Sequence, residues 1–116
     1  MRVYLIPAQA PCLPHDIDVK SIPDTDYDTG HYAGLMALQE MVGGWIEPCA
    51  PVQLREQGIE LLCNDEGLLT GLPYNINMFP FFFVGNLVAV GVKGDKFVSL
   101  TPEQEQWLKQ WIENLS

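Results

Sequence analysis

The sequence predicts an α+β fold, in which a mostly antiparallel sheet packs against one short internal helix and one C-terminal helix. Two observations support this prediction. Short strand-like segments alternate with glycine, proline and asparagine turn signals through the middle of the chain. One amphipathic helical pattern precedes these segments and another follows them. The length of 116 residues suits one core, so we expect a single domain over residues 1–116.

The composition favours a folded, acidic protein. Hydrophobic residues make up 47% of the chain and charged residues 18%, so a core can form. The net charge of −9 disfavours direct contact with nucleic acid, because phosphates attract cationic side chains, and it permits a basic partner. No apolar run is long enough for a membrane span, and the N-terminus shows no cleavage pattern. We therefore expect a cytoplasmic protein without a membrane segment.

The N-terminal part of the chain holds two predicted strands. Alternating apolar residues predict a short strand over Arg2 to Pro7, and the proline-rich stretch after it excludes regular structure. A second strand is predicted over Ile17 to Ile22. An exposed acidic loop follows, and Asp28 or Thr29 is expected to cap the first helix.

The internal helix is predicted over residues His31 to Val42. Leu35, Leu38 and Val42 recur at three- and four-residue steps, which gives this helix one buried face. Gly43 then supplies the left-handed conformation that commonly ends a helix.

Three segments after this helix have the character of strands and turns. Trp45 to Val52 is predicted to be a strand, and its prolines, Pro48 and Pro51, favour an edge position or a bulge. Ile59 to Cys63 is predicted to be a second strand. Asn64 to Gly67 forms a tight turn between this strand and a returning partner.

The next segments are predicted from the same signals. Leu68 to Gly71 is the returning strand, and Leu72 to Asn77 is a loop. Phe81 to Val84 and Leu87 to Val90 are both strand-like. Gly85-Asn86 between them predicts either a two-residue hairpin turn or a chain that continues through a bulge.

The C-terminal helix has the clearest signals. A turn at Lys93 to Lys96 leads to a strand over Phe97 to Leu100. Thr101 is the expected N-cap, Pro102 suits the first helical position, and Gln104 completes a capping box. We expect the helix to pack on the sheet through one apolar stripe. This stripe consists of Trp107, Leu108, Trp111, Ile112 and Leu115.

Three ordered blocks of residues resemble a small family of domains of unknown function, family 3846, which occurs in phages, plasmids and actinobacteria. The blocks are Leu35 to Gly44 with Ile46-Glu47, then Asn64 to Gly67 with Gly71-Leu72-Pro73, then Val84-Gly85 with Phe97 to Thr101. The chain departs from the family pattern in its longer acidic segment before the helix and in the run Phe79 to Phe83. The resemblance implies a mobile-element or accessory context and supplies no catalytic residue.

Two segments are candidates for binding a partner protein. An acidic loop would attract a basic surface, and exposed aromatic residues usually mark an interface. The alternative for the aromatic segment is burial between the sheet and its covering layers. The candidate residues are Asp24, Asp26, Asp28, Phe79, Phe81 and Phe83.

Two polar turns are candidates for binding a small ligand. If Asn64 and Asp65 lie at the same end of the sheet as Tyr74 and Asn75, their hydrogen-bonding groups would converge on a shallow site. The favoured alternative is that the asparagine and aspartate side chains only satisfy turn backbones.

A calcium loop is a weaker hypothesis. Asp24, Asp26 and Asp28 alternate as in the opening of such a loop, but Gly30 falls one residue late. Leu35 occupies the position that requires a bidentate glutamate. A solvated acidic loop is therefore favoured, and we expect no bound calcium.

Zinc is also a weaker hypothesis. Cys12 and His15 have a suitable spacing, and Cys49, Cys63 or His31 would have to complete the four ligands. The odd number of cysteines instead favours free thiols in a reducing compartment. We expect neither a metal nor another cofactor.

The function that the sequence favours is a non-catalytic accessory protein of a mobile element, which binds a host protein or a second copy of itself. The alternative is a protein that binds a small ligand or nucleotide derivative. A small enzyme that uses Cys12, His15 or Asp65 is the third hypothesis. The chain has no phosphate loop, dinucleotide fingerprint or nucleophile elbow.

Overall fold

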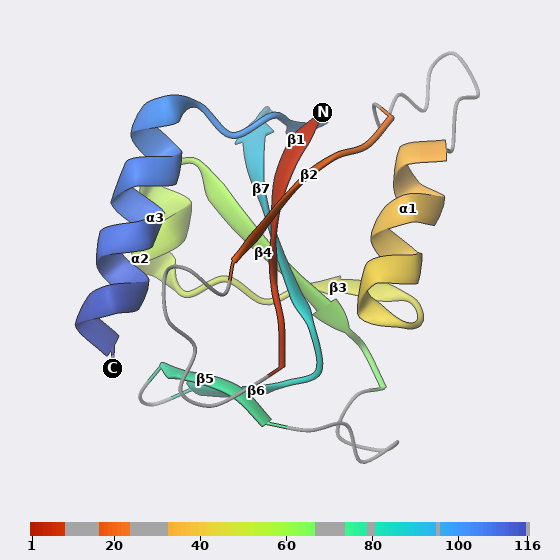
Figure 1. Cartoon of the computed structure of the whole chain (residues 1–116), viewed down its shortest axis with the longest axis horizontal. Helices are drawn as coiled ribbons and strands as arrows, with labels where there is room; N and C mark the ends of the chain where they lie inside the picture. The colour runs from red at the N-terminus through yellow and green to blue at the C-terminus, as the bar shows by residue number, and fades with distance from the viewer. Residues whose placement is uncertain (9–16, 24–32, 67–73, 79–80, 95, 116) are drawn as a thin grey trace.

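A computed structural model describes residues 1–8, 17–23, 33–66, 74–78, 81–94 and 96–115 (Figure 1). For residues 33, 74–78, 81–84 and 115 it describes only the backbone. The strands are β1 (Arg2–Ile6), β2 (Asp18–Ser21), β3 (Ile46–Pro48), β4 (Ile59–Asn64), β5 (Tyr74–Met78), β6 (Phe81–Val84), β7 (Leu87–Lys93) and β8 (Lys96–Val98). The helices are α1 (Ala33–Val42), α2 (Val52–Glu56) and α3 (Pro102–Leu115). None of the described helices is both long and apolar enough to cross a membrane.

The main sheet is six-stranded and antiparallel. Its strands are ordered β2-β1-β7-β4-β3, and β8 pairs with the far end of β7. The central strand β7 pairs with β1 through Tyr4 and Ala89 and with β4 through Leu61 and Ala89. A separate two-stranded sheet contains β5 and β6. The predicted α+β class with a mostly antiparallel sheet is therefore confirmed.

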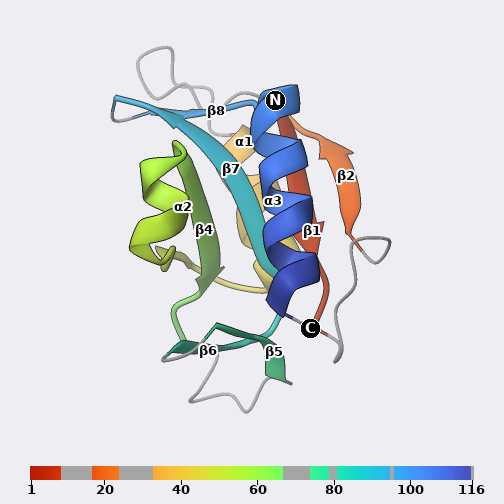
Figure 2. The same cartoon turned by 90° about the vertical axis from the view of Figure 1, so that its left-hand side faces the viewer.

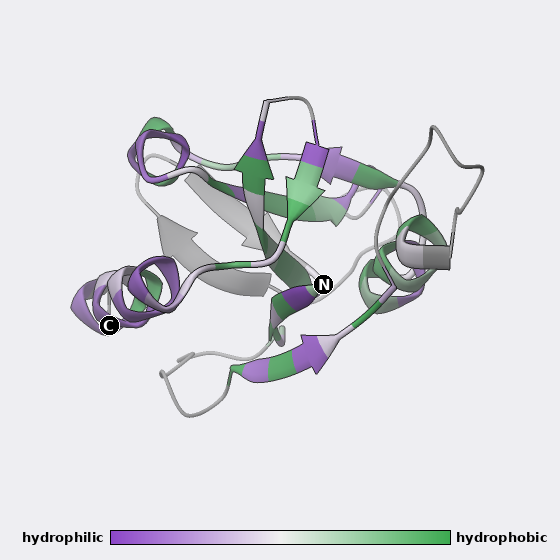
Figure 3. Cartoon of the chain, turned by 90° about the horizontal axis from the view of Figure 1, so that it is seen from above, coloured by the Kyte–Doolittle hydropathy of each residue, from purple (hydrophilic) through white to green (hydrophobic). Residues whose placement is uncertain are grey.

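Helices cover both faces of the main sheet. Figures 1 and 3 show α1 on one side of the sheet and α3 on the other, and Figure 2 shows α2 beside β4. Successive residues of a strand point to opposite faces, so β7 contributes side chains to two cores. The core under α1 consists of Val3, Ile22, Leu38, Val42, Leu62, Val88 and Val90. The core under α2 and α3 consists of Tyr4, Ile6, Ala50, Leu54, Ile59, Leu61, Leu87, Ala89, Leu100, Leu108 and Ile112.

The C-terminal helix follows its sequence signals closely. Thr101 Oγ1 accepts a hydrogen bond from the Gln104 backbone N–H at 3.1 Å, and Gln104 Oε1 accepts one from the Thr101 N–H at 2.9 Å. The predicted capping box is thus present. Leu108 and Ile112 are buried, whereas Trp107 and Trp111 are half-buried and stack with ring centroids 6.0 Å apart. The hydrophilic side of α3 faces away from the sheet (Figure 3).

The first helix also ends as predicted. Gly43 has a φ of +79°, and the N–H groups of Gly43 and Gly44 both donate to the Gln39 carbonyl. Leu38 and Val42 are buried, while Leu35 is only partly so. The described part of the helix begins at Ala33, and the predicted cap near Asp28 lies outside the described residues.

Two predictions about the middle of the chain are wrong, and one of two alternatives is excluded. The strand predicted over Trp45 to Val52 is only β3, and α2 follows it, because Pro51 is extended and the next residues turn to bury Leu54. The segment predicted as a loop up to Asn77 contains β5. Gly85-Asn86 is not a hairpin turn, because β6 and β7 belong to different sheets. The returning strand predicted over residues 68–71 lies outside the described residues.

Candidate functional site

The most prominent candidate among the described residues is one face of the β3–β4 edge. β3 forms one edge of the main sheet and pairs Glu47 with Cys63 on β4. The ladder continues beyond β3, since the Asp65 N–H donates to the Trp45 carbonyl at 3.1 Å. Side chains two residues apart lie on the same face of a strand. Trp45 and Glu47 therefore share a face with Cys63 and Asp65, and we call these four residues the Trp45 surface.

Trp45 is the feature that distinguishes this surface. Its side chain is 69% exposed, the highest value among the large hydrophobic side chains that are exposed in the described part of the chain. Glu47 and Asp65 are exposed as well. An isolated exposed aliphatic side chain is ordinary, but tryptophan is enriched in interfaces because its large ring gains much from burial. The surface thus combines one aromatic ring with two carboxylates.

The opposite face of this edge is anchored. Ile46 packs against the core under α1. The Asn64 side-chain Nδ2 donates to the Val42 carbonyl at 3.2 Å, and its Oδ1 accepts from the Glu66 N–H at 2.8 Å. A strand held in this way presents Trp45 from a fixed position.

The outer rim of β3 is poorly suited to binding another strand. Bonded and non-bonded pairs alternate along an antiparallel ladder. Cys49 donates its N–H to the Leu61 carbonyl at 2.9 Å, so the pair Pro48 and Leu62 is non-bonded. The backbone nitrogen of Pro48, which carries no hydrogen, therefore faces outward. An incoming strand would need an N–H donor at this point. A partner is expected to bind the face of this edge and not its rim.

The residues predicted to bind a small ligand are only partly described. The Asn64 amide forms hydrogen bonds with the end of α1 and with the backbone of its own turn. This agrees with the alternative interpretation, in which the polar side chains only satisfy turn backbones. Asp65 lies on the Trp45 surface with an exposed side chain. Tyr74 and Asn75 belong to β5, and their side chains lie outside the described residues.

The residues predicted to bind a partner lie mostly outside the described part of the chain. Asp24, Asp26, Asp28 and Phe79 are not described. Phe81 and Phe83 belong to β6, which is described by its backbone alone. The acidic loop and the aromatic segment therefore stay predictions.

Cys63 of the Trp45 surface lies near a second thiol, Cys49. Cys49 and Cys63 are both free and half-buried, and both pack against the core under α2 and α3. A hydrogen bond to the Cys63 sulfur, followed by burial, raises the pKa of the Cys49 thiol. The same hydrogen bond lowers the pKa of Cys63, against the opposing effects of burial and nearby carboxylates. The described residues include no group of three or more metal-ligating side chains, and Cys12, His15 and His31 lie outside them.

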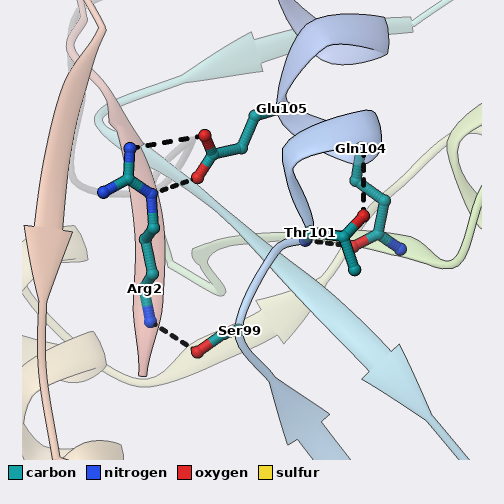
Figure 4. A network of polar contacts seen from close by, with 5 residues as sticks. All are labelled: Arg2, Ser99, Thr101, Gln104 and Glu105. Atoms are coloured by element: carbon teal, nitrogen blue, oxygen red, sulfur yellow. Dashed lines mark hydrogen bonds and ion pairs between the residues drawn. The ribbon is translucent and has the colours of Figure 1, made fainter.

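A second polar cluster joins β1 to α3. Figure 4 shows Arg2 paired with Glu105, and the Arg2 backbone N–H donates to Ser99 Oγ at 2.9 Å. Burial raises the pKa of the Glu105 carboxyl, but the combined effects of Arg2, Tyr4 and Lys109 outweigh burial, and the pKa is lowered. Burial, followed by Glu105, raises the pKa of Tyr4 to about 12. The Tyr4 hydroxyl is buried and has no hydrogen-bond partner among the described residues. Because Arg2 and Glu105 neutralise each other, we assign this cluster to holding α3 on the sheet.

Comparison with known proteins identifies the family. The family described as "Domain of unknown function (DUF3846)" matches residues 1–114. The chain belongs to this family. No curated protein and no solved structure matches it. The resemblance inferred from the three sequence blocks is thus correct for the family, and the family description assigns no activity to DUF3846 members.

Sequence reasoning gave no role to Trp45 and no partner to Cys49. No local signal marks Trp45 as exposed, because an apolar residue after a glycine-ended helix commonly packs back on that helix. The meeting of Cys49 with Cys63 depends on the register between β3 and β4, for which this DUF3846 chain carries no local signal.

Proposed function

We propose that the chain is a non-catalytic accessory protein that binds a basic segment of another protein through the Trp45 surface. The observation that supports this proposal is a tryptophan that is 69% exposed on an anchored sheet edge, with Glu47 and Asp65 on the same face. Tryptophan is among the residues that most often dominate the energy of an interface. The anchored edge lowers the entropy that binding would cost.

The charge of the chain supports a basic partner. Acidic residues number 15 and basic residues 6, so the chain attracts cationic surfaces at long range. At short range an arginine guanidinium can stack on the indole of Trp45 while the neighbouring carboxylates accept its hydrogen bonds. A cation over an aromatic face contributes about 0.5–2 kcal/mol, depending on how fully the pair is desolvated. Arginine is therefore the expected central residue of the partner segment.

The wider context comes from the resemblance stated above. The proposal includes a mobile-element setting, a cytoplasmic location and a host protein as the partner. Asp24, Asp26 and Asp28 would add to long-range attraction, and the segment from Phe79 to Phe83 would add a second apolar contact.

The test uses short arginine-containing peptides and the same peptides with glutamine in place of arginine. Binding is measured by surface plasmon resonance at two salt concentrations. We expect Trp45→Ala to weaken binding of the arginine peptides about tenfold or more, through faster dissociation. Glu47→Gln with Asp65→Asn should mainly slow association, and this effect should shrink at high salt.

The matched control is Met36→Ala. Met36 is 66% exposed but lies on α1, away from the proposed surface, so its loss should leave binding unchanged. Equal binding by the native chain and the Trp45→Ala variant would overturn the proposal. A thermal shift caused by nucleotides or other metabolites, lost in Tyr74→Ala and retained in Trp45→Ala, would favour the small-ligand alternative instead.

A further inference from the structure

Cys49 and Cys63 form a diagonal pair on neighbouring strands. Cys49 lies opposite Leu61, and Cys63 lies opposite Glu47, so the two cysteines are two residues apart along the ladder and share one face. Both are half-buried, which leaves them reachable from solvent. This pairing brings together residues that are far apart in the sequence and places them at the edge of the sheet.

The environments of the two sulfurs give them different roles. The interaction between the two side chains lowers the pKa of Cys63 and raises the pKa of Cys49, and the Cys63 thiol donates to the Glu47 carbonyl at 3.5 Å. The thiol with the lower pKa forms the thiolate more readily, and the thiolate is the attacking species in disulfide exchange. Cys63 is therefore the expected nucleophile, and Cys49 is the thiol that resolves the intermediate.

We propose that Cys49 and Cys63 form a reversible disulfide by exchange with a low-molecular-weight disulfide. The Cys63 thiolate attacks one sulfur of the small disulfide, whose S–S bond breaks and releases one small thiolate. Cys49 then loses its proton to solvent and attacks Cys63 in the mixed disulfide, which releases the second small thiolate. The two cysteines are oxidised with loss of two hydrogens, and one small disulfide is reduced to two thiols.

The geometry explains why this bond would be labile. Diagonal neighbours in a regular ladder have Cα atoms about 7–8 Å apart, whereas disulfides usually join Cα atoms about 4.4–6.8 Å apart. The segment at Cys49, just beyond the end of β3, must therefore move along the ladder toward Cys63, which it can do because it follows an edge strand and lies away from the anchored residues Ile46 and Asn64. Strained and accessible disulfides are the ones that exchange readily, as a reversible modification requires.

The experiment uses the full chain with Cys12→Ser, so that only these two thiols remain. The folded protein is incubated with bis(2-hydroxyethyl) disulfide, which is neutral and so avoids repulsion by the acidic surface. We expect intact mass to fall by two hydrogens and peptide mapping to join Cys49 to Cys63. The ratio of this disulfide to mixed disulfides should be about tenfold higher in the folded chain than in urea, because folding raises the effective concentration of one thiol at the other.

Single variants test the roles of the two sulfurs. Cys49→Ser should leave a stable mixed disulfide on Cys63, and Cys63→Ser should make Cys49 react about tenfold more slowly. Stable mixed disulfides on both cysteines, or equal ratios in the folded and urea-unfolded chain, would overturn the proposal. If Cys12→Ser fails to fold, the same reaction is carried out on the native chain. A disulfide formed mainly between Cys12 and either of the other two cysteines would then contradict the proposal. The outcome is independent of whether the Trp45 surface binds a partner.

Discussion

The two long helices are attached to the sheet at opposite ends. α3 is held near its start, where Gln104 Nε2 donates to the Gln57 and Gly58 carbonyls and Glu105 pairs with Arg2. α1 is held at its finish, where the Asn64 and Asn86 amides donate to the last carbonyls of the helix, at 3.2 Å each. Both attachments satisfy backbone groups that a helix end or turn leaves free. The remaining length of each helix depends on apolar packing.

The two faces also differ in what lies beneath the helix. The core under α1 is small and entirely aliphatic, whereas the core under α2 and α3 is larger and contains Tyr4. Trp107 and Trp111 also pack against the larger core, whereas Phe97 is the one aromatic side chain among the described residues that packs against the smaller core. This difference indicates that the α3 side contributes more of the stability, and that the α1 side has more freedom to adjust.

The largest effect should come from truncating the buried leucines on the two faces. Leu108→Ala should lower the free energy of unfolding by about 4 kcal/mol and Leu38→Ala by about 3 kcal/mol, because both create cavities and the smaller core can relax more completely. Both leucines are fully buried, which makes the pair well matched. Urea denaturation measures both values. Met36→Ala, an exposed position on α1, should change stability by less than about 0.5 kcal/mol. A larger loss for Leu38→Ala than for Leu108→Ala would reverse the comparison.

The next effect depends on pH and concerns Tyr4. Burial raises the pKa of Tyr4 to about 12, so the fold favours the neutral phenol. The stability that the fold gains from the neutral phenol is fully present below the ordinary tyrosine pKa of about 10. It is lost as the pH rises toward 12. The native chain should therefore lose about 2 kcal/mol between these pH values that Tyr4→Phe does not lose. Near pH 7 Tyr4→Phe should leave the free energy of unfolding unchanged or slightly higher, because it removes a buried hydroxyl that has no hydrogen-bond partner among the described residues.

Urea denaturation of both proteins at several pH values measures this difference. Parallel loss of stability in the native chain and in Tyr4→Phe would show that Tyr4 is not the responsible group. A lower free energy of unfolding in Tyr4→Phe than in the native chain at neutral pH would instead reveal a hydrogen bond from the Tyr4 hydroxyl.

The smallest effect should come from the two helix attachments. Thr101→Ala removes the side-chain acceptor of the capping box at the start of α3, and Asn64→Ala removes the donor to the end of α1. Each should lower the free energy of unfolding by about 1 kcal/mol. Hydrogen exchange followed by NMR should locate each loss, with faster exchange in the first turn of α3 for Thr101→Ala and around Val42 for Asn64→Ala. Faster exchange throughout the chain in either variant would contradict a local role.

Local chemistry explains which elements were predictable. The capping box of α3 and the glycine end of α1 depend on residues a few positions apart, and both were confirmed. α2 was missed because five residues are too few to show a helical period. The hairpin at Gly85-Asn86 failed although Gly85 has the positive φ that such a turn requires, because β6 pairs with β5 and β7 lies in the main sheet, a choice of partners that depends on tertiary packing. Asn86 instead contacts Met41 and Ala8 through its amide.

The candidate site was less predictable than the fold. The exposure of Trp45 depends on where α1 ends and on which strand becomes the edge of the sheet. The contact between Cys49 and Cys63 depends on a register that only tertiary packing fixes. Sequence reasoning instead selected runs of similar residues, such as the acidic loop and the aromatic segment. Composition reveals such runs, whereas a surface assembled from separate strands requires the fold.

The pairing of β1 with β7 has a consequence for how the chain is made. Tyr4 is translated well before its partner Ala89. A nascent chain therefore carries the apolar β1 without its central neighbour until β7 has been made, apart from the contact with β2. Contacts this distant in sequence slow folding, and exposed apolar strands attract chaperones. The main sheet can close only after the ribosome has delivered β7, because β7 lies between β1 and β4.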